Sequence, residues 1–102
     1  MNNVFGIRNN LYDEIINLFI LENIEKAILF GSRSRGDFKS NSDIDLAIIF
    51  NDNAYDNYIK LLTKLENLNT LYKFDIIDFN RITNEKLKEE ILKDGICIYK
   101  KK

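Results

Sequence analysis

One stretch of this 102-residue sequence combines residue types that can hold a phosphate and a metal ion. It opens with Gly31 and Ser32, and two acidic residues, Asp43 and Asp45, follow after an interval of ten residues. A glycine followed by a serine in a turn lets backbone N–H groups and a hydroxyl approach an anion closely, because glycine has no Cβ to obstruct it. We expect this anion to be a phosphate.

Arginines also gather in this stretch. Arg33 and Arg35 are two of only four arginines in a chain that otherwise prefers lysine. The planar guanidinium suits bidentate contacts with phosphate, so both arginines are candidate nucleotide-binding residues. Ser42, near the end of the same polar stretch, is a further candidate. Alternative roles stay open: either arginine could be a solvated loop cation, Arg35 could pair with Asp37, and Ser42 could hydrogen-bond within the loop.

The acidic residues have the spacing of a cation site. Asp43 and Asp45 lie two residues apart on a predicted strand, so both side chains point to the same face. Mg²⁺ takes oxygen ligands and commonly shares one or two carboxylates with substrate phosphates. On the next predicted strand Asp75 lies among apolar residues, where an unpaired carboxylate is costly unless a cation compensates it. We therefore predict Asp43, Asp45 and Asp75 as metal ligands and Asp78, on the opposite face, as solvated.

The elements that position these residues alternate along the chain. Apolar periodicity predicts helices and strands, joined by a polar loop or short helical turn over 32–42. The predicted helices cover 11–23, 55–68 and 84–93, and the predicted strands cover 26–30, 43–50, 72–79 and 96–99. This order indicates one small α/β domain with a mixed sheet of about four strands and helices packed on it.

Local signals predict where the helices begin and end. Asn10 is the predicted N-cap of the first helix, with Asp13 and Glu14 in its first turn. Thr83 is the predicted N-cap of the last helix, and Gly95 is the predicted left-handed residue at its C-terminal end.

Composition excludes several classes of chemistry. Without histidine, the chain can form neither a Ser-His-Asp or Cys-His relay nor a histidine-based zinc site. The net charge of −1 gives no broad electropositive field, so we expect neither nucleic acid nor a membrane as a direct partner. The single cysteine, Cys97, is expected to be a small buried residue. With no apolar run of roughly 20 residues, a cytoplasmic location is predicted.

The interval from Gly31-Ser32 to Asp43-Ile44-Asp45 resembles the Gly-Ser-x10-Asp-x-Asp signature of the DNA polymerase β-like nucleotidyltransferase superfamily. Asp75 matches the third catalytic carboxylate of that signature. Residues 1–102 as a whole resemble one minimal nucleotidyltransferase (MNT) domain. They are most similar to the minimal nucleotidyltransferases that act as antitoxins beside a helical HEPN-domain toxin.

This resemblance implies a fold and an activity. Asp43, Asp45 and Asp75 would be catalytic and hold two Mg²⁺ ions, and Gly31 and Ser32 would hold the phosphates of ATP. The implied reaction moves AMP from ATP to a tyrosine hydroxyl of a HEPN partner in a hetero-oligomer, and the partner's ribonuclease activity is lost. One alternative is a non-catalytic module that neutralises the partner by complex formation, and a less favoured one is transfer to a small molecule or RNA.

Overall fold

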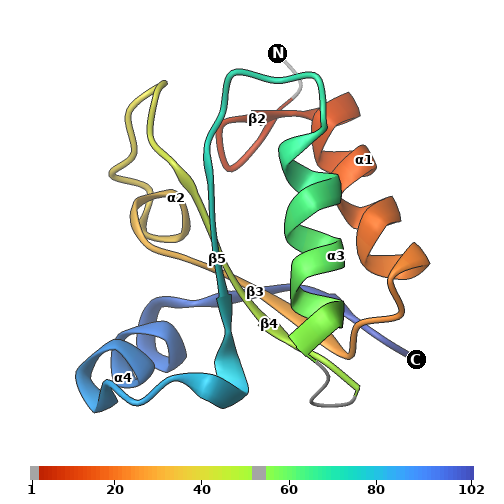
Figure 1. Cartoon of the computed structure of the whole chain (residues 1–102). Helices are drawn as coiled ribbons and strands as arrows, with labels where there is room; N and C mark the ends of the chain where they lie inside the picture. Colours follow the sequence, from red (N-terminus) through yellow and green to blue (C-terminus); the bar gives the residue numbers. More distant parts are fainter. Residues whose placement is uncertain (1–2, 52–54) are drawn as a thin grey trace.

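A four-stranded mixed sheet forms the centre of the molecule in a computed structural model that describes residues 3–51 and 55–102 (Figure 1). In order across the sheet the strands are β5 (Phe74–Asp78), β4 (Ile44–Ile49), β3 (Lys26–Phe30) and β6 (Ile96–Lys100). β4 runs parallel to β5 and antiparallel to β3, and β3 runs antiparallel to β6. The predicted α/β class and mixed sheet are confirmed.

Helices cover both faces of this sheet. The longer ones are α1 (Asn9–Leu21), α3 (Tyr55–Glu66) and α4 (Glu85–Asp94). The shorter elements are the hairpin of β1 (Asn3–Val4) and β2 (Ile7–Arg8), the four-residue helix α2 (Ser32–Arg35) and the 3-10 turn η1 (Phe79–Arg81). In the described part of the chain no helix has the length and apolar character needed to cross a membrane.

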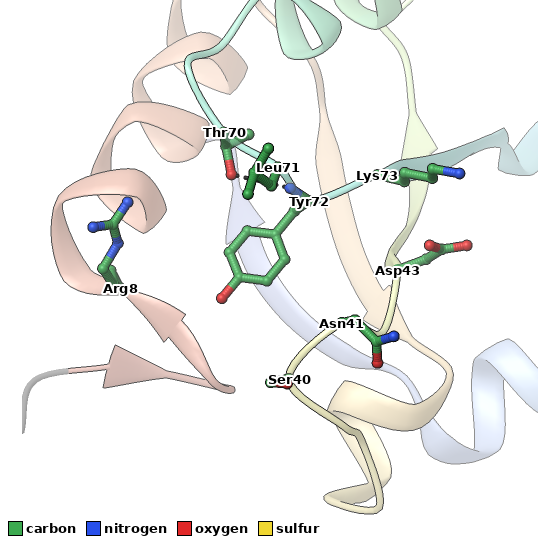
Figure 2. Close-up of a pocket in the computed structure, with 8 residues that line it drawn as sticks. All are labelled: Arg8, Ser40, Asn41, Asp43, Thr70, Leu71, Tyr72 and Lys73. Carbon is green, nitrogen blue, oxygen red and sulfur yellow. Dashed lines mark hydrogen bonds between the residues drawn. The ribbon is translucent and has the colours of Figure 1, made fainter.

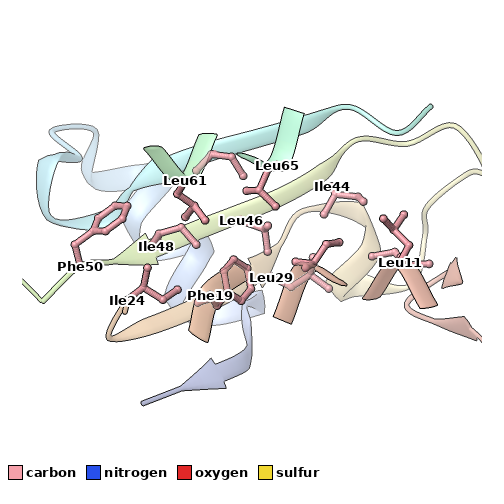
Figure 3. Close-up of a cluster of buried hydrophobic side chains, with 14 residues drawn as sticks. Leu11, Phe19, Ile24, Leu29, Ile44, Leu46, Ile48, Phe50, Leu61 and Leu65 are labelled. Atoms are coloured by element: carbon pink, nitrogen blue, oxygen red, sulfur yellow. The ribbon is translucent and has the colours of Figure 1, made fainter. Parts of the chain in front are cut away.

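The alternation of side chains along β4 divides the core into two clusters. Ile44, Leu46 and Ile48 pack with α1 and α3 in the larger cluster, which Figure 3 shows. Ala47 points to the other face, where it packs with Ile91 of α4. The α1 side chains that meet the sheet recur at helical spacing, and Leu11, Ile15 and Phe19 are buried.

Both predicted helix N-caps are wrong. α1 begins at Asn9 with Arg8 as its N-cap, so Asn10 lies inside the helix and the first turn contains no acidic residue. Asn84 caps α4 in place of Thr83, because its side-chain oxygen accepts a hydrogen bond from the backbone N–H of Leu87 at 3.1 Å. The error at α4 is a shift of one residue, since Thr and Asn side chains can both make this contact. At α1 the helix begins before Asn10, and Arg8 makes no side-chain cap hydrogen bond.

Gly95 and Cys97 also differ from expectation. Gly95 is extended (φ −68°, ψ 145°), so it is not a left-handed residue. A Cβ at this position would lie 2.2 Å from the carbonyl oxygen of Ile91 and 2.5 Å from the side chain of Ile28, so close packing requires the glycine. Cys97 is exposed because β6 is an edge strand.

Candidate active site

The predicted site residues meet at one end of the sheet. β3 ends where its neighbour β4 begins, because the two strands are antiparallel, and the parallel strand β5 begins at the same end. The register places Asp45 between Phe30 on β3 and Asp75 on β5. Gly31 directly follows Phe30, so the predicted turn and two of the predicted carboxylates lie in a row across three strands.

These carboxylates lie on the face of the sheet that α4 covers only in part. Asp45 and Asp75 precede Ala47 and Ile77 by two residues on their strands, and both of those residues pack toward Ile91 of α4. Asp45 remains half-buried, whereas Asp43 and Asp75 are exposed. The carboxylates are therefore open to a ligand that approaches this end of the sheet.

The backbone at Gly31 allows the Asp45 carboxylate to lie directly against the turn. Gly31 has φ 77° and ψ −154°, and a Cβ there would lie 2.2 Å from Oδ2 of Asp45. Glycine is the residue that tolerates both the backbone angles and the contact. The turn continues into α2, where the Ser34 hydroxyl donates to the Gly31 carbonyl at 2.9 Å, and Gly36 ends the helix in the left-handed conformation.

The electrostatics of Asp45 link the three aspartates. Burial, followed by the negative charges of Asp75 and Asp43, raises the pKa of Asp45 to about 6, while Arg33 and Arg35 act in the opposite direction. Like charges near a half-buried carboxylate disfavour its ionised form, and a bound cation would favour that form. The oxygen donors and their uncompensated charge thus fit a hard cation such as Mg²⁺.

The three aspartates do not form a preassembled metal centre within the described residues. Among residues 3–51 and 55–102, no group of three or more acidic, cysteine or histidine side chains is arranged to hold a metal ion. Asp75 is exposed rather than surrounded by apolar side chains, so the burial argument for it as a ligand does not hold. Asp43, Asp45 and Asp75 therefore form an electrostatic group, and their joint coordination of a metal stays a prediction.

The Arg33 side chain is buried and bonded to other parts of the protein. Its side chain is 1% exposed, and its guanidinium donates to the carbonyl oxygens of Phe5 at 3.0 Å and Ser42 at 2.8 Å. The guanidinium also lies over the rings of Phe38 and Tyr72, 5.0 and 4.9 Å from their centroids. These contacts join the N-terminal hairpin to both loops of the site and leave no exposed surface for a phosphate, so Arg33 supports the site from behind.

The other candidate nucleotide-binding residues differ in accessibility. Arg35 is exposed and pairs with Asp37 at 3.2 Å, as the alternative interpretation predicts, and such an exposed pair opens readily. The Ser42 hydroxyl accepts a hydrogen bond from the backbone N–H of Lys39 at 2.8 Å, which also matches its alternative. Ser32 is half-buried as the first residue of α2, next to Gly31. Gly31, Ser32 and Arg35 therefore remain the residues best placed to contact phosphate.

A cleft of about 580 Å³ opens beside Asp43 (Figure 2). Its lining comes from the start of α1, the loop before β4 and the loop before β5, namely Arg8, Ser40, Asn41, Asp43, Thr70, Leu71, Tyr72 and Lys73. The Tyr72 hydroxyl donates to the Gly6 carbonyl at 3.2 Å and so fixes one wall. Sequence reasoning identifies only Asp43 of this set, because no local pattern brings residue 8 close to residue 73.

Comparison with known proteins finds a matching family and related chains. Residues 13–102 match the family described as "Polymerase beta, Nucleotidyltransferase". A Methanocaldococcus jannaschii protein named "Putative protein adenylyltransferase" is 35% identical over 85 residues, covering 74% of this chain and 79% of the relative.

Two solved structures share the fold. A chain in a structure described as a toxin-antitoxin with AMP-PNP is 24% identical with a TM-score of 0.64, covering 88% of this chain and 73% of that one. A chain in the structure of a tri-AMPylated Shewanella oneidensis HEPN toxin in complex with MNT antitoxin is 20% identical with a TM-score of 0.59, covering 90% of this chain and 71% of that one. With its family match over residues 13–102, this chain belongs to the polymerase beta nucleotidyltransferase family.

Proposed function

We propose that this protein is a Mg²⁺-dependent adenylyltransferase that moves AMP from ATP to a hydroxyl, a tyrosine of a HEPN-type toxin, and thereby acts as its antitoxin. The observation that carries the proposal is the Asp45 carboxylate, which lies against the Gly31 turn, in register with Asp75 and with its pKa raised to about 6. The name of the archaeal relative and the AMPylated toxin in the Shewanella complex support AMP as the transferred group.

The residues would divide the work as follows. Gly31 and Ser32, with Arg35, would hold the β- and γ-phosphates, and Asp43 and Asp45 would hold Mg²⁺. When bound, Mg²⁺ supplies positive charge that stabilises the negative charge developing on the phosphates. The acceptor oxygen attacks the α-phosphorus, the bond from this phosphorus to the bridging oxygen breaks, and pyrophosphate leaves. Asp75 receives the proton of the attacking hydroxyl, directly or through water.

A second candidate is a module that neutralises a HEPN partner by complex formation without chemistry. It is favoured by one observation: among the described residues the aspartates are not gathered into a metal-ligand group. In that case Mg²⁺ or nucleotide would stabilise the interface alone.

The deciding experiment incubates the protein with Mg²⁺, ATP labelled at the α-phosphate and the product of a neighbouring gene that encodes a helical protein. Transfer predicts that the partner gains one or more AMP units, and that Asp43→Asn/Asp45→Asn abolishes the gain. The matched control, Glu89→Gln/Glu90→Gln, changes the charge equally at exposed positions of α4 and should retain activity. An unmodified partner in a tight complex would refute transfer and support the binding module.

A further inference from the structure

The cleft beside Asp43 reaches from the loop before β4, which supplies Ser40 and Asn41, to the loop before β5, whereas the proposed phosphate site directly follows β3. In the sheet, β4 separates β3 from β5. Gly31 and Ser32 follow β3, whereas Thr70, Leu71, Tyr72 and Lys73 of the cleft precede β5. Neither Gly31 nor Ser32 lines the cleft, and among the described residues that line it Asp43, just before β4, is the one acidic side chain.

The direction of the reaction assigns an occupant to this side. In phosphoryl transfer the attacking and leaving oxygens lie roughly in line on opposite sides of the phosphorus. With pyrophosphate leaving toward Gly31 on the β3 side, the attacking hydroxyl must arrive from the β5 side. Asp75 lies on that side, and so do the cleft residues that precede β5, Thr70 to Lys73. A volume of about 580 Å³ is enough for an aromatic side chain together with parts of its neighbours.

The cleft's charge indicates which acceptor it favours. Arg8 and Lys73 stand on either side of the Tyr72 ring (Figure 2), both are exposed, and neither forms an ion pair within residues 3–51 and 55–102. Asp43 is the single opposing charge, and a metal ion bound to it would cancel that charge. Two unpaired cations across a cleft favour a ligand with negative charge on both sides of its centre.

The proposed function requires a polypeptide acceptor, and the rim of the cleft offers such a ligand an apolar contact. Leu71 is fully exposed at the rim, where a protein segment can cover its apolar surface. We propose that this cleft receives the acceptor as a protein segment with acidic residues on both sides of its hydroxyl, and that Arg8 and Lys73 select it. This inference rests on the proposed function, since it names the substrate class of the same site.

The test measures binding of three fluorescent peptides that differ only in the residues beside a central tyrosine: two Glu, two Gln or two Lys on each side. Mg²⁺ and α,β-methylene-ATP, which cannot transfer AMP, are present throughout. We expect the Glu peptide to bind about tenfold more tightly than the Gln peptide, and high salt to reduce this difference. Equal binding of the Glu and Gln peptides would overturn the inference.

Charge variants locate the effect. Arg8→Glu/Lys73→Glu should reverse the preference toward the Lys peptide, and Arg8→Gln/Lys73→Gln, which avoids new charges at the start of α1, should abolish it. Lys60→Glu/Lys86→Glu, the same charge change at exposed positions of α3 and α4, should leave the preference intact. The affinity for the ATP analogue should stay within about twofold, and a larger loss would assign the cleft to the nucleotide and overturn the inference.

The same peptides separate this inference from the proposed function. With labelled ATP in place of the analogue, the wild-type protein should transfer AMP to the Glu peptide faster than to the Gln peptide. Tight and selective binding without transfer would refute adenylyl transfer and leave the cleft assignment standing. Transfer at equal rates to all three peptides would support the proposed function and overturn the selection by Arg8 and Lys73.

Discussion

Replacing Gly31 with alanine tests the central geometric claim about the site. The backbone angles of Gly31 (φ 77°, ψ −154°) fall in a region that is almost confined to glycine, where another residue costs about 1–3 kcal/mol. The added Cβ would lie 2.2 Å from Oδ2 of Asp45, and forcing an extra methyl into a packed position costs about 1–3 kcal/mol more. We expect Gly31→Ala to lower the free energy of unfolding by about 2–6 kcal/mol and to displace the carboxylate.

Two companion variants separate these costs in urea unfolding followed by circular dichroism. Gly36 also has a positive φ (88°), but nothing lies within 4 Å of a Cβ placed there, so Gly36→Ala should cost only about 1–2 kcal/mol. Asp45→Ala removes the oxygens that the new Cβ would overlap. In a protein that already carries Asp45→Ala, Gly31→Ala should therefore lower the free energy of unfolding by about 1–3 kcal/mol less than it does in the wild-type protein. If Gly31→Ala costs no more than Gly36→Ala, or if this coupling is absent, the claimed approach of Asp45 to the turn is wrong.

Two further predictions concern the arginine behind the site and the raised pKa. Arg33→Lys keeps the charge but loses the planar group that bonds to the Phe5 and Ser42 carbonyls, so the free energy of unfolding should fall by about 2–4 kcal/mol in the same assay; an unchanged value would show that these contacts do not support the fold. Because the Asp45 pKa is raised from 3.8 to about 6, the folded protein holds this proton more tightly than the unfolded chain, so without metal the free energy of unfolding should decrease as the pH rises from about 4 to about 6. Millimolar Mg²⁺ should raise the melting temperature more at pH 7 than at pH 5, where the proton competes, and Asp45→Asn should remove both effects; an identical pH profile in that variant would contradict the assignment.

The spacing of residues in the sequence predicts the chemical part of the site. The segment from Gly31 to Asp45 connects the end of β3 to the start of its neighbour β4, so patterns within a short part of the sequence determine it. The predicted strand over 26–30 agrees residue for residue with β3, because its apolar run ends abruptly at Gly31. Alternation likewise predicts that Asp45 and Ala47 share a face.

The remaining features depend on contacts between distant residues. Arg33 is buried because Phe5 and Tyr72, 28 and 39 positions away, meet around it, and nothing in the loop's own sequence indicates this. The cleft is formed by residues 8, 40, 41, 43 and 70–73 for the same reason. Cys97 lies in an apolar run that resembles a buried strand, but the order of strands puts β6 at an edge. Periodicity describes one element and its faces, whereas burial also depends on which elements become neighbours.

The bonds that close the site also restrict when it can first exist during synthesis. The Tyr72 hydroxyl bonds to the carbonyl of Gly6, 66 residues earlier in the chain, and Arg33 bonds to Phe5 from the middle of that interval. A chain still on the ribosome therefore cannot assemble the walls of the cleft until Tyr72 has left the exit tunnel, although the Gly31 turn and β4 emerge well before. During translation the Gly31 turn is thus synthesised before the residues that line the proposed acceptor site, so the proposed phosphate contacts precede the proposed acceptor contacts in the order of synthesis.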